Sequence, residues 1–177
     1  TSGYGIKLLN QTKHLNLQYT PGQVSYLDKN QIKISLDSNI SYGGYITPQV
    51  DGKVTIGSTF EKFKSFRSSL SETSHRENLK KMPVILRNQI IRDTSKINFR
   101  KLKGNVSIRV SAYDRLPLAG KLENDLYILS GLGSKGMVWA PLMGEALACM
   151  ILNHPVGLEN NMIKACDPNR IEKFLLS

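Results

Sequence analysis

A glycine-rich loop near the end of the chain carries the most recognisable chemistry. Residues 131–136 read GLGSKG, follow an apolar run from Leu126 to Ser130, and precede a helical pattern from Met137 to Asn153. A strand, a G-x-G-x-x-G loop and a helix in this order are typical of the dinucleotide-binding fingerprint. In that fingerprint the glycines let backbone N–H groups approach a phosphate at the helix N-terminus.

The residues after the helix argue against a dinucleotide site. That fold needs a further strand and an acidic residue about 20 positions on, whereas His154-Pro155 and a polar stretch lead to the end of the chain. We therefore expect the N–H groups of the loop to face another electron-rich edge, such as a flavin ring. The candidate cofactor-binding residues are Gly131, Gly133, Ser134, Lys135, Gly136 and Met137.

Arg109 is the candidate substrate-binding residue. It alternates with Ile108 and Val110, so a strand would place its side chain on the opposite face from these apolar neighbours. A guanidinium that projects into a cleft can bind a carboxylate with two hydrogen bonds, although an exposed surface arginine fits the pattern equally well. No Ser-His-Asp set, Cys-His pair, carboxylate pair or metal-ligand spacing stands out, so neither a side-chain hydrolase nor a metal site is supported.

The composition fits an intracellular protein. Hydrophobic residues make up 40% of the 177 residues, and no apolar run approaches the length of a membrane span. The first residues lack the features of a signal peptide, and the two cysteines show no disulfide or metal pattern. We expect a cytoplasmic location, no membrane partner and no metal.

The chain is basic, with a net charge of +10 from 24 Lys and Arg against 14 Asp and Glu. Such an excess suits nucleic-acid binding, but a solvated basic surface without a partner explains it as well. The charge is concentrated in three groups in the middle of the chain: Lys62, Lys64 and Arg67; Arg76, Lys80, Lys81 and Arg87; Lys96, Arg100, Lys101 and Lys103. Phe60, Phe63, Phe66 and Phe99 lie among them; such rings could stack on bases, but inward packing is the favoured expectation.

The elements that must position these residues indicate an α+β fold. Short strands are predicted at residues 23–27, 31–36, 44–48 and 54–57, with a hairpin turn at Asp51-Gly52. A helix begins at Ser71 or Ser74 and continues to Ile90, with a break or kink at Pro83. Strands at 104–110 and 126–130 precede the last helix. The sheet is expected to be mainly antiparallel, with a C-terminal strand-loop-helix piece.

Together these segments resemble the D-amino-acid-oxidase-like (DAO) family of FAD-dependent amine oxidases, which includes glycine and sarcosine oxidases. The resemblance is strongest to the branch that finishes 5-methylaminomethyl-2-thiouridine at the tRNA wobble position. The motifs that carry it are Gly22-Gln23-Val24-Ser25, Gly44-Tyr45-Ile46-Thr47-Pro48, Ile56-Gly57-Ser58-Thr59-Phe60, Arg109 with Asp114-x-x-Pro117-x-x-Gly120, Leu132-Gly133-Ser134-Lys135-Gly136 before Ala140-Pro141-Leu142, and Asp167-Pro168-Asn169-Arg170.

The resemblance implies a division of the chain. Residues 1–15 would be a returning segment of the FAD-binding domain, 16–103 the substrate domain, 104–153 the C-terminal FAD-binding segment, and 154–177 a tail. The family's nucleotide-binding β-α-β unit would lie upstream of Thr1, and Pro21 stands where the family has an arginine. We expect a fragment, inactive alone, that is partnered by an upstream FAD-binding half. A fused SAM-dependent methyltransferase domain is left open.

The implied reaction is FAD-dependent oxidation of carboxymethylaminomethyl-uridine in tRNA. A hydride leaves the carbon between the amine and the carboxylate, and hydrolysis of the imine releases glyoxylate and leaves the aminomethyl base. Arg109 would clamp the carboxylate, and Tyr45 would hydrogen-bond it, with Gly43 and Gly44 leaving room for the ligand. The alternatives are an oxidase of a small free amino acid, similar to glycine or sarcosine oxidase, and a non-catalytic RNA-binding fragment. If tRNA is the substrate, Lys80, Lys81, Arg100, Lys101 and Lys103 are expected to lie on the rim of the substrate domain.

Overall fold

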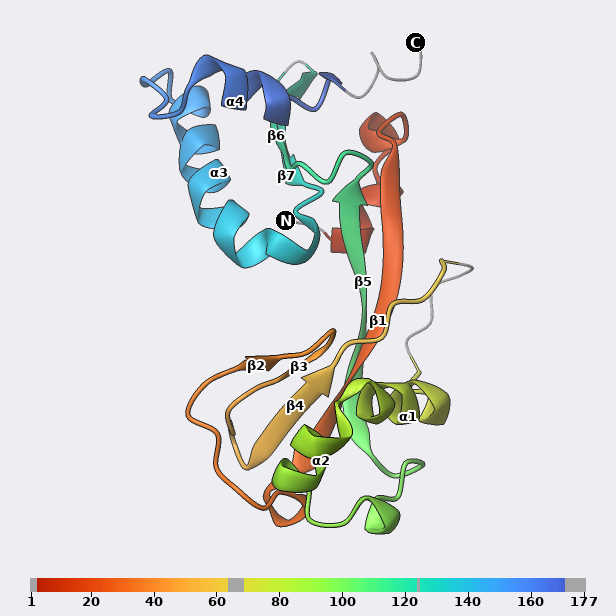
Figure 1. Ribbon diagram of the computed structural model, residues 1–177. Helices are drawn as coiled ribbons and strands as arrows, with labels where there is room; N and C mark the ends of the chain where they lie inside the picture. The colour runs from red at the N-terminus through yellow and green to blue at the C-terminus, as the bar shows by residue number, and fades with distance from the viewer. Residues whose placement is uncertain (1–2, 64–68, 124, 171–177) are drawn as a thin grey trace. The chain divides into compact units, whose positions relative to one another are not determined.

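The computed structural model describes residues 3–63, 69–123 and 125–170 (Figure 1). It divides into two compact units, one formed by residues 1–20 with 108–177 and the other by residues 21–107. The strands β1 (Leu17–Asp28) and β5 (Lys103–Ala112) contribute residues to both units. The fold is α+β, as the sequence predicts.

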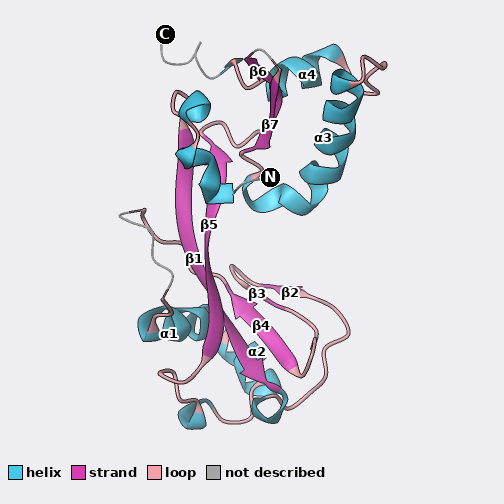
Figure 2. Ribbon diagram, turned by 180° about the vertical axis from the view of Figure 1, so that it is seen from behind, coloured by secondary structure: helices cyan, strands magenta, loops and turns pink. Residues whose placement is uncertain are grey.

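The sheet has five strands in the order β2-β3-β4-β1-β5. Besides β1 and β5 it contains β2 (Ile40–Ser41), β3 (Tyr45–Ile46) and β4 (Lys53–Gly57). The pairs β1–β4, β2–β3 and β3–β4 are antiparallel, which confirms the expected sheet type (Figure 2). Asp51 and Gly52 both have positive φ and lie between the bridged residues Val50 and Lys53, so the predicted hairpin turn is present.

The strand predicted at residues 31–36 is wrong. β1 continues to Asp28, and residues Lys29–Gln31 then form the 3-10 helix η3, closed by a capping box between Asp28 and Gln31. Beyond it, Ile32 makes only an isolated bridge to Ile91. The alternating pattern predicted one buried face that contains both Ile32 and Ile34. Ile32 is indeed buried, but Ile34 is 48% exposed, so the two side chains do not share a packed face.

Two helices pack on the sheet of the unit formed by residues 21–107. They are α1 (Glu72–Lys81) and α2 (Val84–Ile90), and Pro83 separates them where the sequence predicts a break (Figure 1). Ser71 caps α1 by accepting a hydrogen bond from the N–H of Ser74. The core beneath them consists of Leu27, Ile32, Ile46, Val54, Ile56, Leu79, Met82, Ile90, Ile91, Ile97 and Leu102.

The other unit is built around an antiparallel hairpin of β6 (Leu118–Glu123) and β7 (Leu126–Ser130). One core cluster there includes Ile6, Leu17, Val110, Leu118 and Ile128, and a second joins Ala119, Met143 and Cys166. The sequence reasoning missed β6 because the segment LAGKLE lacks β-branched residues and contains a glycine.

Helices complete this unit. The 3-10 helices η1 (Gly3–Leu8) and η2 (Asn10–Thr12) precede β1, while α3 (Gly136–Ile151) and α4 (Asn160–Cys166) follow the hairpin. α3 buries Met143 and Ala146 but leaves several large apolar side chains exposed, namely Met137, Val138, Leu142 and Ile151. Among the described residues, no helix combines the length and apolar character needed to cross a membrane.

Candidate flavin and substrate site

The glycine-rich loop joins β7 to α3 through a backbone that requires glycine. Gly131 and Gly133 have φ values of +65° and +58°, in the left-handed region that side-chain-bearing residues rarely adopt. The 3-10 helix η5 (Gly133–Lys135) then leads directly into α3 at Gly136. The predicted order of strand, loop and helix is therefore confirmed.

The loop lies against the end of β5. Ser111 forms a bridge with Leu132. A Cβ atom on Gly131 would lie 3.2 Å from the backbone nitrogen of Ala112, and one on Gly133 would lie 3.5 Å from the Cβ of Ser111. These contacts place the glycine-rich loop beside the strand that carries Arg109.

Arg109 lies on the same face of β5 as Ser111. Ile108 and Val110 are buried in the core, whereas Arg109 is half-buried. Because side chains two apart in a strand share a face, Arg109 lies on the face that Gly133 approaches. The structure thus brings together the two parts of the predicted site that belong to this unit.

The start of α3 has the donors that an electron-rich edge would need. Its N-cap residue, Lys135, makes no capping hydrogen bond through its side chain. The first N–H groups of a helix have no partner within the helix, and the helix dipole adds positive potential there. Ser134, Lys135 and Met137 are exposed beside these groups, and this donor set fits the carbonyl edge of a flavin. The described part of the chain contains no cluster of His, Cys, Asp or Glu suited to a metal.

Tyr45 lies in the other unit, on β3 of the five-stranded sheet. Its carbonyl accepts a hydrogen bond of 3.1 Å from the hydroxyl of Tyr42. Burial, with a smaller contribution from Tyr45, raises the pKa of Tyr42 to about 12. The expected room beside Tyr45 is absent at Gly44, because a Cβ there would lie 2.8 Å from the carbonyl oxygen of Gly57 and 3.0 Å from the ring of Tyr42. Gly44 therefore permits close strand packing, whereas a Cβ on Gly43 would meet no atom within 4 Å.

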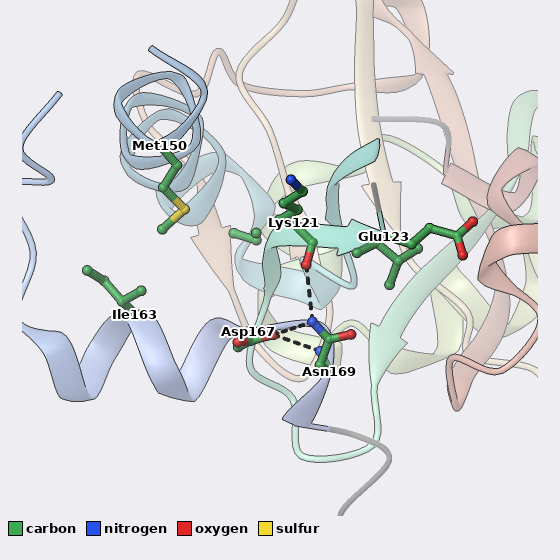
Figure 3. Close-up of a pocket in the computed structure, with 9 residues that line it drawn as sticks. Lys121, Glu123, Met150, Ile163, Asp167 and Asn169 are labelled. Carbon is green, nitrogen blue, oxygen red and sulfur yellow. Dashed lines mark hydrogen bonds between the residues drawn. The ribbon is translucent and has the colours of Figure 1, made fainter. Parts of the chain in front are cut away.

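None of the predicted site residues lines a pocket between β6, the end of α3 and α4. It has a volume of about 390 Å³ and is lined by Ala119, Gly120, Lys121, Leu122, Glu123, Met150, Ile163, Asp167 and Asn169. Figure 3 shows the side-chain amide of Asn169 reaching the carbonyl oxygen of Lys121, at 3.1 Å, and Asp167. The Asp167–Arg170 motif therefore ties the tail to β6, a contact that the sequence reasoning did not anticipate.

The predicted basic residues differ in their surroundings. Lys80, Arg100, Lys101 and Lys103 are exposed. Lys81 is half-buried, pairs with Glu77 at 2.9 Å and donates to the carbonyl of Ser58. Lys64, Phe66 and Arg67 lie outside the described residues.

A buried polar network joins β1 to α1 and was also missed. The hydroxyl of Ser25 lies 2.7 Å from Nδ1 of His75, and the amide of Asn78 donates to the same hydroxyl. All three residues are buried, so substrate has no access and the Ser–His pair is structural. Burial lowers the pKa of His75, an effect that a hydrogen bond with the Leu102 backbone partly opposes.

A family model described as "FAD dependent oxidoreductase" (DAO) matches residues 1–150. The chain belongs to this family.

Among curated proteins the chain is similar to the tRNA 5-methylaminomethyl-2-thiouridine biosynthesis bifunctional protein MnmC. It is 28% identical to that of Pseudomonas syringae pv. syringae (strain B728a) over 193 residues, covering 93% of this chain and 29% of the relative. It is 33% identical to that of Azoarcus sp. (strain BH72) over 150 residues, covering 75% and 22%. The chain thus spans less than a third of the length of these relatives.

Solved structures share the fold. Glycine oxidase from Geobacillus kaustophilus matches with a TM-score of 0.67 at 17% identity, covering 88% of this chain and 40% of that one. L-Proline dehydrogenase from P. horikoshii matches with a TM-score of 0.65 at 19% identity, covering 98% and 46%.

Proposed function

We propose that this chain is the C-terminal part of a flavoenzyme that removes the carboxymethyl group from carboxymethylaminomethyl-(2-thio)uridine at the tRNA wobble position. The products would be the aminomethyl-uridine and glyoxylate. Membership of the DAO family supports the flavin chemistry, and the names of the MnmC relatives support the tRNA substrate.

The position of Arg109 beside the glycine-rich loop carries the proposal. Ser111 pairs with Leu132, and Arg109 lies two residues earlier on the same face of β5. A guanidinium there can hold the substrate carboxylate with two hydrogen bonds, so that the carbon between the carboxylate and the amine is oriented toward the loop. Tyr45 remains a predicted second contact to the carboxylate.

The loop residues would hold the cofactor. FAD, when bound, supplies the hydride acceptor, while the protein supplies orientation and electrostatics. The N–H groups of the loop and of the first turn of α3 would hydrogen-bond the pyrimidine edge. The N-terminal dipole of α3 would favour negative charge on that edge. The residues in this role are Gly131, Gly133, Ser134, Lys135, Gly136 and Met137.

The proposal requires a partner region. The chain covers 40% and 46% of two solved structures of this fold and less than a third of the MnmC relatives. An upstream FAD-binding half would supply the nucleotide site, and a SAM-dependent methyltransferase domain is the predicted source of the second activity that the word bifunctional denotes. The proposed location is the cytoplasm, where tRNA is modified.

The test is oxidation by the holoenzyme that contains this chain. It should convert tRNA carrying carboxymethylaminomethyl-uridine to the aminomethyl form, measured by nucleoside mass spectrometry, and release one glyoxylate per base. Free glycine should be a poor substrate. Rapid oxidation of glycine with tRNA left unchanged would instead establish the free amino-acid oxidase.

A further inference from the structure

One carboxylate on α1 holds two arginines from separate segments. Arg76 donates to Oε1 of Glu72 from Nη2 at 2.7 Å and from Nε at 3.2 Å. Arg100 donates from Nε to the other oxygen, Oε2, at 3.2 Å. We call this arrangement of Arg76, Glu72 and Arg100 the arginine fork.

Phe99 supports the fork from beneath. The guanidinium carbon of Arg76 lies 4.4 Å from the centre of the Phe99 ring, and Phe99 itself packs against the core cluster of the unit. The Arg76 side chain nevertheless remains 59% exposed. One face of its guanidinium therefore rests on an aromatic ring while one edge pairs with Glu72, and together these contacts favour a single orientation before any ligand arrives.

The surroundings of the fork are positive. Lys80 lies one helical turn after Arg76 on α1, and Lys101 and Lys103 follow Arg100; all three are exposed. The negative charge of Glu72 is compensated by Arg76 and Arg100 within the fork. The other acidic residue of α1, Glu77, pairs with Lys81 instead. Cations thus outnumber carboxylates around a fixed planar group.

We propose that the arginine fork binds single-stranded RNA, with one unstacked base on Arg76 and neighbouring phosphates on Arg100, Lys80 and Lys101. This deepens the proposed function and rests on it, because it names the contact that a tRNA loop would make. Unpaired RNA bases stack on aromatic rings and on guanidinium planes, while Lys and Arg hold the phosphates.

The geometry favours a base over an acidic peptide. Glu72 already occupies the Nε and Nη2 donors along one edge of Arg76, so a carboxylate partner cannot form the side-on bidentate pair there. The guanidinium plane and the remaining N–H donors of Nη1 and Nη2 are what can recognise a ligand. A nucleobase offers a flat π surface for that plane, whereas a carboxylate does not.

The experiment measures binding of an unmodified tRNA transcript to the holoenzyme that contains this chain, by fluorescence anisotropy at several salt concentrations. Arg76→Lys keeps the charge but removes the plane, so affinity should fall about fivefold or more with an unchanged salt slope. Arg100→Gln should lower the slope by about one. Lys29→Gln, which removes an exposed lysine of η3 outside the fork, is the matched control for charge.

If Arg76→Lys binds the transcript with the same affinity as the unaltered protein, the stacking role is wrong. If Lys29→Gln lowers the salt slope as much as Arg100→Gln does, the binding depends on overall positive charge and not on the fork. A single-stranded oligonucleotide should compete with the transcript better than a duplex of the same length, and the reverse order would also count against the proposal.

Failure of the fork is distinguishable from failure of the proposed function. If the Arg76→Lys holoenzyme still oxidises modified tRNA with unchanged KM, the fork is wrong and the function stands. Oxidation of glycine alone would reject the function itself.

Discussion

Arg170 grips Asp114 with two parallel hydrogen bonds, from Nε to Oδ2 at 2.8 Å and from Nη2 to Oδ1 at 3.0 Å. The same guanidinium donates to the carbonyls of Leu116 and Asp167. Arg170 is only 10% exposed, and the turn that it holds joins β5 to β6. Two motifs 56 residues apart therefore form one structural clamp directly after the strand that carries Arg109.

Breaking this clamp should destabilise the unit. Arg170→Ala is expected to lower the free energy of unfolding by about 1–3 kcal/mol, because the charged acceptor Asp114 loses its partner. Arg170→Lys keeps the charge but loses the parallel geometry, so its free energy of unfolding should lie between those of the unaltered protein and Arg170→Ala. Urea denaturation measures the effect, with Arg92→Ala as an exposed control. A loss no larger than that of the control would mean that the clamp contributes nothing.

Arg109 should control substrate capture. In the holoenzyme, Arg109→Ala is expected to raise KM for the carboxylated substrate, with a loss of about 2–5 kcal/mol in transition-state binding. Arg109→Lys should recover part of the lost transition-state binding. The flavin content of the purified variant is measured alongside, since a parallel loss of flavin would assign Arg109 a structural role.

The left-handed glycines of the loop should be intolerant of alanine. Gly133→Ala meets only ordinary contacts, so its cost should be the backbone strain of about 1–2 kcal/mol. Gly131→Ala adds a tight approach to Ala112 and should be worse. Both should lower the flavin absorbance per protein in the holoenzyme. Gly157→Ala, at a position with open space and no positive φ, is the matched control and should bind flavin normally.

Stability should fall on mild acidification because of His75. Its pKa is lowered from 6.5 in the folded state by burial, so the unfolded chain binds the proton more readily. The stabilisation is complete above pH 6.5 and is lost as the pH falls through the folded pKa. In His75→Gln, unfolding free energies measured between pH 8 and pH 5 should show a shallower decline, whatever the variant's overall stability. An identical slope would show that another group titrates in this window.

Local signals in the sequence predicted local structure well. The Asp51-Gly52 turn, the break at Pro83 and the glycine-rich loop are each set by the φ preferences of a few neighbouring residues. The Ile32–Ile34 alternation failed because a strand also needs a partner, and the capping box at Asp28 ends β1 first. The Arg170–Asp114 clamp and the arginine fork depend on long-range approach, to which spacing along the chain gives no guide.

The exposed apolar residues of α3 and the net positive charge of the chain have opposite effects on self-association, and salt changes the balance between them. A helix that is apolar all round belongs in an interior, and here Met137, Val138 and Ile151 face solvent. At low salt the net charge of +10 keeps copies of the chain apart. Added salt screens that repulsion, and sulfate in particular strengthens apolar burial. If the arginine fork binds RNA as proposed, the salt that weakens its phosphate contacts also favours contact between these exposed apolar side chains. Only the second effect would depend on protein concentration in the absence of RNA.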